Sequence, residues 1–174
     1  HTVDWSKTFN YFIDTYQRVD LEPHVVLRNK HGKKIMDLEK ADISRMQEMG
    51  WKAPERFKVK AADGVTDLYG VMWKPFDFDS TKHYPIISSV YPGPFYEYVP
   101  TQFDFIHGRN TQLAQLGFIV IAVGHRGGSP MRGKYYHTYG FGNLRDYPLA
   151  DDKYAIEQLA DRYSYIDATR VGIF

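Results

Sequence analysis

The sequence predicts an α/β fold, in which a mainly parallel sheet with helices follows a set of short antiparallel strands. Two observations predict it. Between Trp5 and Leu38, short aromatic-rich runs alternate with polar breaks, which is typical of antiparallel strands joined by turns. From Tyr84 onward, apolar runs alternate with amphipathic segments, which is typical of the strands and helices of an α/β sheet. The change of pattern divides the chain in two.

The first part of the chain contains signals for strands, one helix and one hairpin. Strands are expected over residues 9–15, 25–27 and 35–38, because each run is short, apolar and followed by turn residues. Asp42 is the expected N-cap of a short helix that Gly50 ends. Beyond Pro54, two further segments, residues 56–60 and 68–73, flank Asp63 and Gly64, and this pattern predicts a β-hairpin.

The second part predicts three strands and two helices. Strands are expected over residues 86–90, 118–123 and 171–174, and helices over residues 103–116 and 149–162. Asp151 and Asp152 are interpreted as capping groups at the head of the second helix. A parallel strand at the end of the sequence leaves the sheet about half built. Because the sequence also starts at His1 without Met, we expect it to be part of a longer protein.

The composition excludes several classes of protein. The 22 basic and 21 acidic residues give a formal net charge of +1 and are spread along the chain, so we expect no nucleic-acid partner. The chain has no cysteine, which excludes disulfides, a thiol nucleophile and Cys-ligated zinc. The 7 histidines form no metal-binding motif, and we expect neither a metal nor a cofactor. No apolar run reaches the roughly 18 to 20 residues that span a bilayer.

The first candidate site is the turn Tyr91-Pro92-Gly93-Pro94. It follows an expected strand directly and therefore lies where open α/β sheets bind ligands. Its prolines fix the backbone, and Phe95, Tyr96 and Tyr98 add aromatic surface beside it. A tyrosine hydroxyl held in this way can donate a hydrogen bond to a developing oxyanion. The alternative interpretation is a rigid turn with a core tyrosine, and the spacing alone favours it.

The second candidate site is the loop Gly124-His125-Arg126-Gly127-Gly128-Ser129, which follows the strand expected at 118–123. The loop matches neither phosphate-binding motif, so nucleotide binding is not indicated. His125 and Ser129 are a candidate base and nucleophile, but neighbours on one loop rarely have the geometry that catalysis needs. A structural role for this loop is therefore the favoured interpretation.

Taken in order, these segments resemble the prolyl oligopeptidase family of serine peptidases, and its dipeptidyl peptidase IV branch above all. The individual motifs are weak, but their order and spacing are specific to that family. The matching segments are Phe12-Ile13-Asp14-Thr15-Tyr16, Asp63-Gly64, Leu68-Tyr69-Gly70, Lys74-Pro75, Tyr84-Pro85, Val90-Tyr91-Pro92-Gly93-Pro94, Arg126-Gly127, Asp151, Tyr165-Ile166-Asp167 and Arg170-Val171-Gly172.

The resemblance implies a domain layout and a place for the catalytic residues. The fold is expected to be the first half of an α/β-hydrolase domain preceded by terminal β-propeller strands. The implied boundaries are residues 1–40 for the propeller end, 41–55 for a connecting helix and linker, and 56–174 for the hydrolase part. The nucleophile would follow next in a Gly-x-Ser-x-Gly elbow. The serine, aspartate and histidine of the triad are therefore expected beyond Phe174. Tyr91 matches the oxyanion tyrosine, and Phe95 and Tyr96 are expected to contribute to binding.

The function implied by the resemblance is that of a serine peptidase that releases N-terminal dipeptides, Xaa-Pro or Xaa-Ala, through an acyl-enzyme. The alternatives are another α/β hydrolase, namely an oligopeptidase, an acylaminoacyl peptidase or an esterase, or a binding or structural piece without catalysis. The 174 residues alone are expected to be inactive. The expected partners are a peptide substrate and the remainder of the same protein, and a homodimer is left open. A periplasmic or extracellular location is implied by the resemblance alone.

Overall fold

The computed structural model describes residues 1–91, 93, 96–143 and 146–174, and the chain forms two compact units. The first unit consists of residues 1–53 and 101–105, and the second of residues 54–100 and 106–174. None of the helices in these described ranges is both long and apolar enough to cross a membrane.

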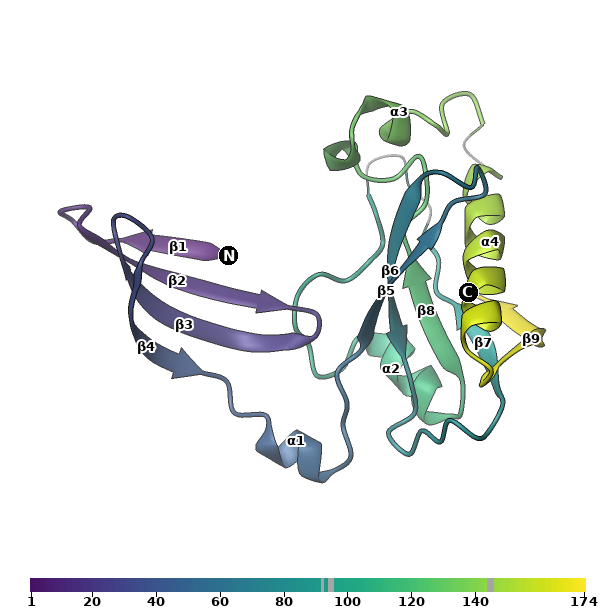
Figure 1. The fold of residues 1–174 in the computed structure, drawn as a ribbon, viewed down its shortest axis with the longest axis horizontal. Helices are drawn as coiled ribbons and strands as arrows, with labels where there is room; N and C mark the ends of the chain where they lie inside the picture. Colours follow the sequence, from purple (N-terminus) through teal and green to yellow (C-terminus); the bar gives the residue numbers. More distant parts are fainter. Residues whose placement is uncertain (92, 94–95, 144–145) are drawn as a thin grey trace. The chain divides into compact units, whose positions relative to one another are not determined.

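The first unit is built on a four-stranded antiparallel sheet, drawn in purple to blue in Figure 1. Its strands pair in chain order: β1 (Thr2–Trp5), β2 (Tyr11–Arg18), β3 (Leu21–Asn29) and β4 (Lys34–Lys40). The predicted strands correspond to the last three, and β1 is an addition. Asp14 is buried in this sheet, where its carboxylate accepts hydrogen bonds from Arg28 Nε and His1 Nδ1, both at 2.8 Å.

The helix α1 (Ser44–Glu48) follows this sheet, close to the predicted position. The predicted N-cap is one residue off, because Ile43 occupies the N-cap position. Asp42 still accepts a hydrogen bond from the Ser44 backbone N–H at 2.9 Å, so its carboxylate satisfies one of the free N–H groups at the helix start. Gly50 follows the helix with a φ of +84°, a conformation that favours glycine.

An aromatic cluster changes the expected helix over residues 103–116. The Trp51 indole Nε1 donates to the Phe105 carbonyl oxygen at 2.9 Å, and the rings of Phe103 and Phe105 lie edge-on to Trp51 at 5.7 and 5.9 Å. These residues belong to the first unit. The helix α2 therefore covers only Gly108–Gln115, and the prediction placed its start too early because tertiary contacts outweigh local spacing.

The second unit contains a five-stranded sheet in the order β5-β6-β8-β7-β9. The strands are β5 (Glu55–Lys60), β6 (Asp67–Trp73), β7 (Tyr84–Ser88), β8 (Ile119–Val123) and β9 (Ile166–Ile173). β5 and β6 form the predicted hairpin, with Gly64 in its turn at a φ of +71°. β6 pairs with β8 in antiparallel fashion, whereas β7 runs parallel to both β8 and β9.

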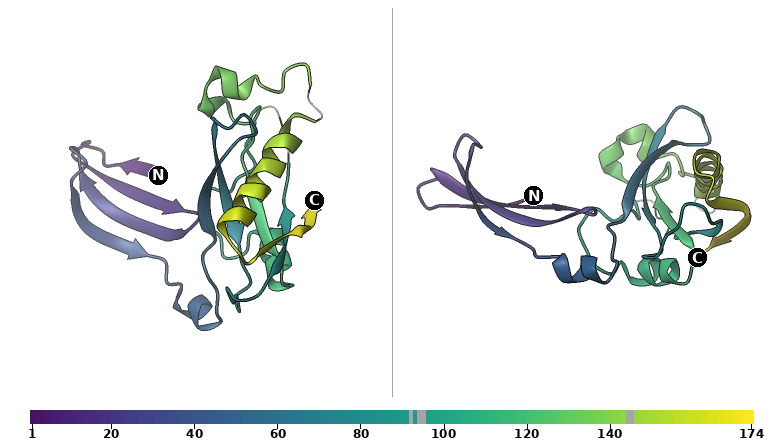
Figure 2. Two further views of the ribbon diagram at one scale, coloured as in Figure 1. Left: turned by 45° about the vertical axis from the view of Figure 1, so that its right-hand side comes forward. Right: turned by 60° about the horizontal axis from the view of Figure 1, so that its bottom comes forward.

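The core of the second unit lies between this sheet and the helix α4 (Tyr147–Arg162), which packs against β5 and β9 (Figure 2). β8 is buried along its whole length, as expected for a central strand. Ala155, Ile156 and Leu159 form the apolar stripe of α4 that faces this core. Between β8 and α4 lie a short 3₁₀ turn, η1 (Pro130–Arg132), and the short helix α3 (Lys134–His137).

The start of α4 corrects one prediction about its acidic residues. The helix begins at Tyr147, with Asp146 as N-cap and Pro148 in its first turn, which suits a residue without a backbone N–H. Asp151 and Asp152 are therefore in the second turn, and both are buried. Their predicted capping role is wrong, because neither lies among the first residues whose N–H groups are unsatisfied.

Candidate active site

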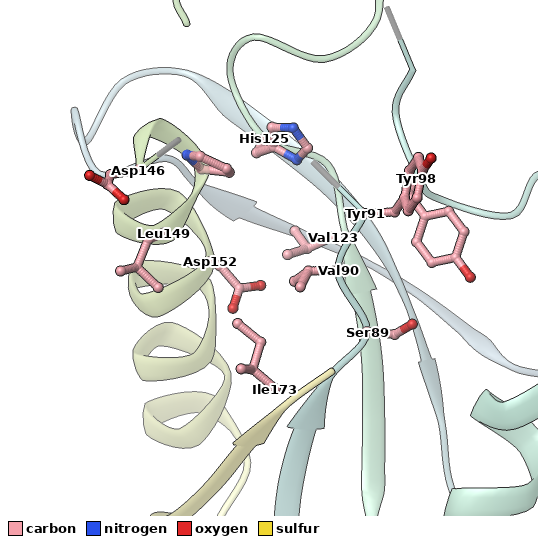
Figure 3. A pocket seen from close by; sticks show the side chains of 11 residues that line it. Ser89, Val90, Tyr91, Tyr98, Val123, His125, Asp146, Leu149, Asp152 and Ile173 are labelled. Atoms are coloured by element: carbon pink, nitrogen blue, oxygen red, sulfur yellow. The ribbon is translucent and has the colours of Figure 1, made fainter. Parts of the chain in front are cut away.

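The carboxyl ends of the parallel strands β7, β8 and β9 meet at one edge of the sheet of the second unit. Open α/β sheets bind ligands at this edge. A cavity of about 200 Å³ opens there between the loops after β7 and β8 and the start of α4 (Figure 3). Its lining residues are Ser89, Val90, Tyr91, Tyr98, Val123, His125, Asp146, Pro148, Leu149, Asp152 and Ile173.

Tyr91 reaches the cavity from the loop after β7, as the sequence predicts for a group at the carboxyl end of a strand. It lies on the side of the cavity opposite α4 (Figure 3). The residue is 65% exposed, and the centroid of its ring is 5.8 Å from that of the Tyr98 ring. The core-tyrosine alternative for this turn is therefore wrong, because this phenol faces solvent. An exposed phenol at a cavity mouth can donate a hydrogen bond to an incoming oxygen.

Tyr91, Tyr96 and Tyr98 form a tyrosine cluster. The rings of Tyr96 and Tyr98 are 6.3 Å apart and tilted by 52°. Tyr96, a predicted binding residue, is exposed and belongs to this cluster, but Tyr98 is the one that lines the cavity beside Tyr91. Phe95, the other predicted binding residue, lies outside the described residues.

Asp152 is a cavity residue that the sequence prediction missed. Its carboxylate Oδ1 accepts a hydrogen bond of 2.6 Å from the Ser88 hydroxyl at the end of β7, and both residues are buried. Burial raises the pKa of the Asp152 carboxyl above its ordinary value, although the Ser88 hydrogen bond opposes the shift. The spacing holds a signal for this role, because Asp152 precedes Ala155, Ile156 and Leu159 by three, four and seven residues on one helix face.

Asp151, one position earlier, fixes the loop after β8. Its buried carboxylate accepts hydrogen bonds from Arg126 Nη2 at 2.7 Å, from Arg126 Nε at 3.0 Å and from the Arg126 backbone N–H at 2.9 Å. It also accepts from the Ala62 backbone N–H at 3.0 Å. Arg126 reaches the turn of the β5–β6 hairpin through Nη1, which lies 3.0 Å from Asp63 Oδ2. The predicted structural role of this loop agrees with these contacts.

Asp63 shows the electrostatic effect of that network. Partial burial acts to raise its pKa, but hydrogen bonds from Thr66 and Val65 and the Arg126 charge outweigh it and lower the pKa to about 2. Asp63 is therefore ionised at neutral pH and holds the hairpin turn to the loop that carries Arg126.

His125 and Ser129 have separate structural partners. His125 is buried beside the cavity, and burial lowers its pKa, which favours a neutral imidazole at pH 7. Its Nε2 lies 3.5 Å from the Tyr147 hydroxyl. The Ser129 hydroxyl oxygen accepts from the Met131 backbone N–H at 3.2 Å and caps η1.

Across the described residues, no group of three His, Cys, Asp or Glu side chains is arranged to hold a metal ion.

The fold and the site define a class: an α/β protein with a cavity at the carboxyl ends of its parallel strands, preceded in sequence by an antiparallel sheet. Solved structures share this arrangement. A protein from Bacteroides ovatus assigned as a dipeptidyl aminopeptidase IV matches 99% of the chain with a TM-score of 0.80 and 30% identity. Porphyromonas gingivalis dipeptidyl peptidase 4 also matches 99%, with a TM-score of 0.75 and 26% identity. The predicted fold class is confirmed.

The sequence comparisons identify the family. Residues 104–174 match the prolyl oligopeptidase family model. Human dipeptidyl peptidase 8 is 32% identical over 121 residues, which are 69% of this chain. The resemblance to the prolyl oligopeptidase family stated from the sequence motifs is confirmed by these matches. The chain spans 13% of the length of human dipeptidyl peptidase 8 and 24% of each of the two solved chains.

Proposed function

We propose that this chain belongs to a serine peptidase that releases N-terminal dipeptides from peptides through an acyl-enzyme, with Tyr91 as an oxyanion-stabilising residue. The observation that carries the proposal is the exposed Tyr91 phenol at the mouth of the cavity, at the carboxyl ends of three parallel strands. The family of residues 104–174 and relatives described as dipeptidyl peptidases support it. Xaa-Pro and Xaa-Ala are the proposed dipeptides.

In the proposed mechanism, the Tyr91 hydroxyl contributes little to substrate binding in the ground state. In this proposal an attacking serine, expected beyond Phe174 from the family resemblance, adds to the scissile carbonyl and places negative charge on the carbonyl oxygen. A phenol hydroxyl donates one hydrogen bond to that oxygen, and a backbone N–H donates the second. The donor acts mainly in the transition state, so its loss should lower kcat more than it changes KM.

The test is Tyr91→Phe in the full-length protein, assayed on an Xaa-Pro dipeptide anilide. Removing one oxyanion donor costs about 100- to 1,000-fold in kcat, so we expect a loss of that order with KM nearly unchanged. Tyr135→Phe is the matched control, because Tyr135 is 93% exposed on α3 and does not line the cavity. A Tyr91→Phe protein with the kcat of the unmodified protein would exclude the proposed role.

The runner-up is a related α/β hydrolase with another substrate, namely an oligopeptidase, an acylaminoacyl peptidase or an esterase. The same oxyanion chemistry serves all of them, so Tyr91 does not separate them. A panel of free dipeptide anilides, N-blocked peptides and simple esters does. We expect the highest kcat/KM on the substrates with a free amino terminus, and preference for N-blocked peptides or esters would favour the runner-up instead.

The domain limits, partners and location are part of the same proposal. We propose propeller strands over residues 1–40, a connecting segment over 41–55 and the catalytic part over 56–174. A peptide is the proposed substrate, the remainder of the same protein is a further partner, and a homodimer is open to test by sedimentation. An extracytoplasmic location is proposed because the solved relatives include a bacterial dipeptidyl peptidase.

A further inference from the structure

Glu97 lies between Tyr96 and Tyr98 of the tyrosine cluster, and its carboxylate is held in a largely buried position. The side chain is 15% exposed. Its Oε1 accepts a hydrogen bond of 2.6 Å from the Tyr136 hydroxyl on α3 and lies 3.6 Å from Arg132 Nη1 on η1. Hydrogen bonds to a carboxylate are shorter and stronger than those between neutral groups, so these contacts hold the Glu97 side chain firmly against η1 and α3.

The two partners of Glu97 are themselves fixed. Arg132 Nη2 donates to the Asp67 carbonyl oxygen at 2.6 Å, and its guanidinium stacks on the rings of Tyr69 and Tyr136 at 5.0 and 4.4 Å. Burial, followed by the Glu97 carboxylate, raises the pKa of the Tyr136 phenol, which keeps it a hydrogen-bond donor at neutral pH. Glu97 thus contacts α3 through Tyr136 and η1 through Arg132, and Arg132 in turn binds the start of β6.

The glycine that ends β8 leaves the space that the Glu97 side chain occupies. A Cβ atom built at Gly124 would lie 1.8 Å from Glu97 Oε1 and 2.7 Å from its carboxyl carbon, so no larger residue fits there without moving Glu97. The Gly124 backbone N–H donates to the Tyr69 carbonyl oxygen at 2.9 Å, so the backbone on that side is fixed as well. The carboxylate therefore sits against the end of a core strand.

Glu97 is linked to Tyr91 through Tyr98, the residue that follows Glu97 in sequence. Tyr98, the next residue, contacts the Tyr91 ring with centroids 5.8 Å apart, and Tyr96 contacts Tyr98. The Val99 backbone N–H donates to the Glu97 carbonyl oxygen at 2.8 Å and closes a tight turn at this point. Tyr91 is largely exposed, and the Tyr98 ring is a described neighbour that contacts it.

We propose that Glu97 is a positioning residue for the reaction: by binding Tyr136 and Arg132 it fixes the segment that carries Tyr98, and Tyr98 in turn orients the Tyr91 phenol. The inference rests on the proposed function, because orienting Tyr91 matters only if Tyr91 acts on the substrate. Glu97 does not touch the reacting atoms in this scheme. It acts through Tyr98 and Tyr91.

The test is a double-mutant cycle in the full-length protein with an Xaa-Pro dipeptide anilide as substrate. A displaced catalytic group loses up to about 100-fold, and a loosened one loses less, so we expect Glu97→Ala to lower kcat about 10-fold with KM changed less than about 3-fold. In the Tyr91→Phe background the same substitution should lower kcat by less than about 2-fold, because two groups that act as a unit are not additive. Equal losses in both backgrounds would overturn the proposal.

Two further measurements separate positioning from folding. Glu97→Gln keeps an oxygen that accepts from Tyr136 and should retain most of the activity, whereas Glu157→Gln, on an exposed carboxylate of α4, is the matched control and should change nothing. Amide hydrogen exchange of residues 96–99 should be faster in Glu97→Ala than in the unmodified protein, with β8 unchanged. If Glu97→Ala does not fold, Tyr136→Phe replaces it in the same cycle.

The outcomes distinguish this inference from the function on which it rests. If Tyr91→Phe leaves kcat unchanged, the proposed function fails and this role of Glu97 fails with it. If Tyr91→Phe lowers kcat but Glu97→Ala does not, only the positioning role fails. A loss of kcat in Glu97→Ala that Glu97→Gln does not restore, with unchanged amide exchange over residues 96–99, also overturns the positioning role.

Discussion

Replacing Asp151 by alanine should strongly weaken the loop after β8. Asp151 is fully buried, and its carboxylate accepts from the Arg126 side chain and from the backbone N–H groups of Arg126 and Ala62. Asp151→Ala leaves a guanidinium that is itself mostly buried without its main partner and leaves two N–H groups unsatisfied. Breaking a buried ion pair from one side costs about 3–5 kcal/mol, so we expect a loss of local stability in that range.

The magnitude follows from the missing partner rather than from the number of bonds. Arg126 keeps its contact with Asp63 Oδ2 at 3.0 Å and its position over the Tyr139 ring at 4.0 Å, and both moderate the loss. The double variant Arg126→Met/Asp151→Leu removes the stranded charge and should recover much of the stability. Recovery should stay incomplete, because the backbone N–H groups of Arg126 and Ala62 still lack an acceptor.

The assay is native-state hydrogen exchange at the amides of Ala62 and Arg126, which donate to Asp151. A loss of 3–5 kcal/mol speeds exchange by roughly two to nearly four orders of magnitude, since about 1.4 kcal/mol is a factor of ten. Asp161→Ala, on an exposed carboxylate of the same helix, is the control and should stay within about 0.5 kcal/mol. Exchange in Asp151→Ala that matches this control would refute the reasoning.

Two more substitutions test the surroundings of the cavity. Burial raises the pKa of Asp152, so ionisation of this carboxyl opposes folding as the pH rises above the ordinary pKa of 3.8. In Asp152→Asn the side-chain oxygen can still accept from Ser88, so this variant should be more stable than the unmodified protein at pH 7. In urea unfolding, the difference in stability between the two proteins should close near pH 4. A gap that grows towards low pH would contradict this sign. Gly124→Ala places a methyl group 1.8 Å from Glu97 Oε1 and should lower the melting temperature. Gly172→Ala places its methyl group 3.4 Å from Ile87 Cγ1 and should be tolerated. Equal melting temperatures for the two variants would contradict the close contact at Gly124.

Local patterns predict the strands and the hairpin but not the full length of each element. The Asp63-Gly64 turn predicted β5 and β6, and an apolar run predicted β8, because both features act over a few residues. β1 was missed because its four residues are all exposed and become a strand only by pairing with β2. The early start predicted for α2 failed because Phe103 and Phe105 pack on Trp51 instead.

The candidate site shows the same limit more clearly. Tyr91 could be predicted because a rigid turn directly after a strand sets its position. The roles of Asp151 and Asp152 could not, because their partners Arg126 and Ser88 are 25 and 64 residues away in sequence. Two acidic residues near the start of a helix fit capping equally well by local rules, and only the position of Tyr147 as first helical residue decides against it.

The two carboxylates connect one turn of α4 to the carboxyl ends of two neighbouring strands. Successive residues of a helix point about 100° apart, so Asp151 and Asp152 leave α4 in different directions. Asp151 binds the loop that follows β8, and Asp152 binds Ser88 at the end of β7, from which the turn with Tyr91 begins. β7 and β8 are already paired side by side in the sheet, so these two contacts add a second link, from one turn of α4 to the carboxyl ends of both strands. Asp152 is therefore buried in the wall of the cavity and Asp151 is buried behind the loop after β8, while the phenol proposed to act on the substrate stays exposed at the cavity mouth.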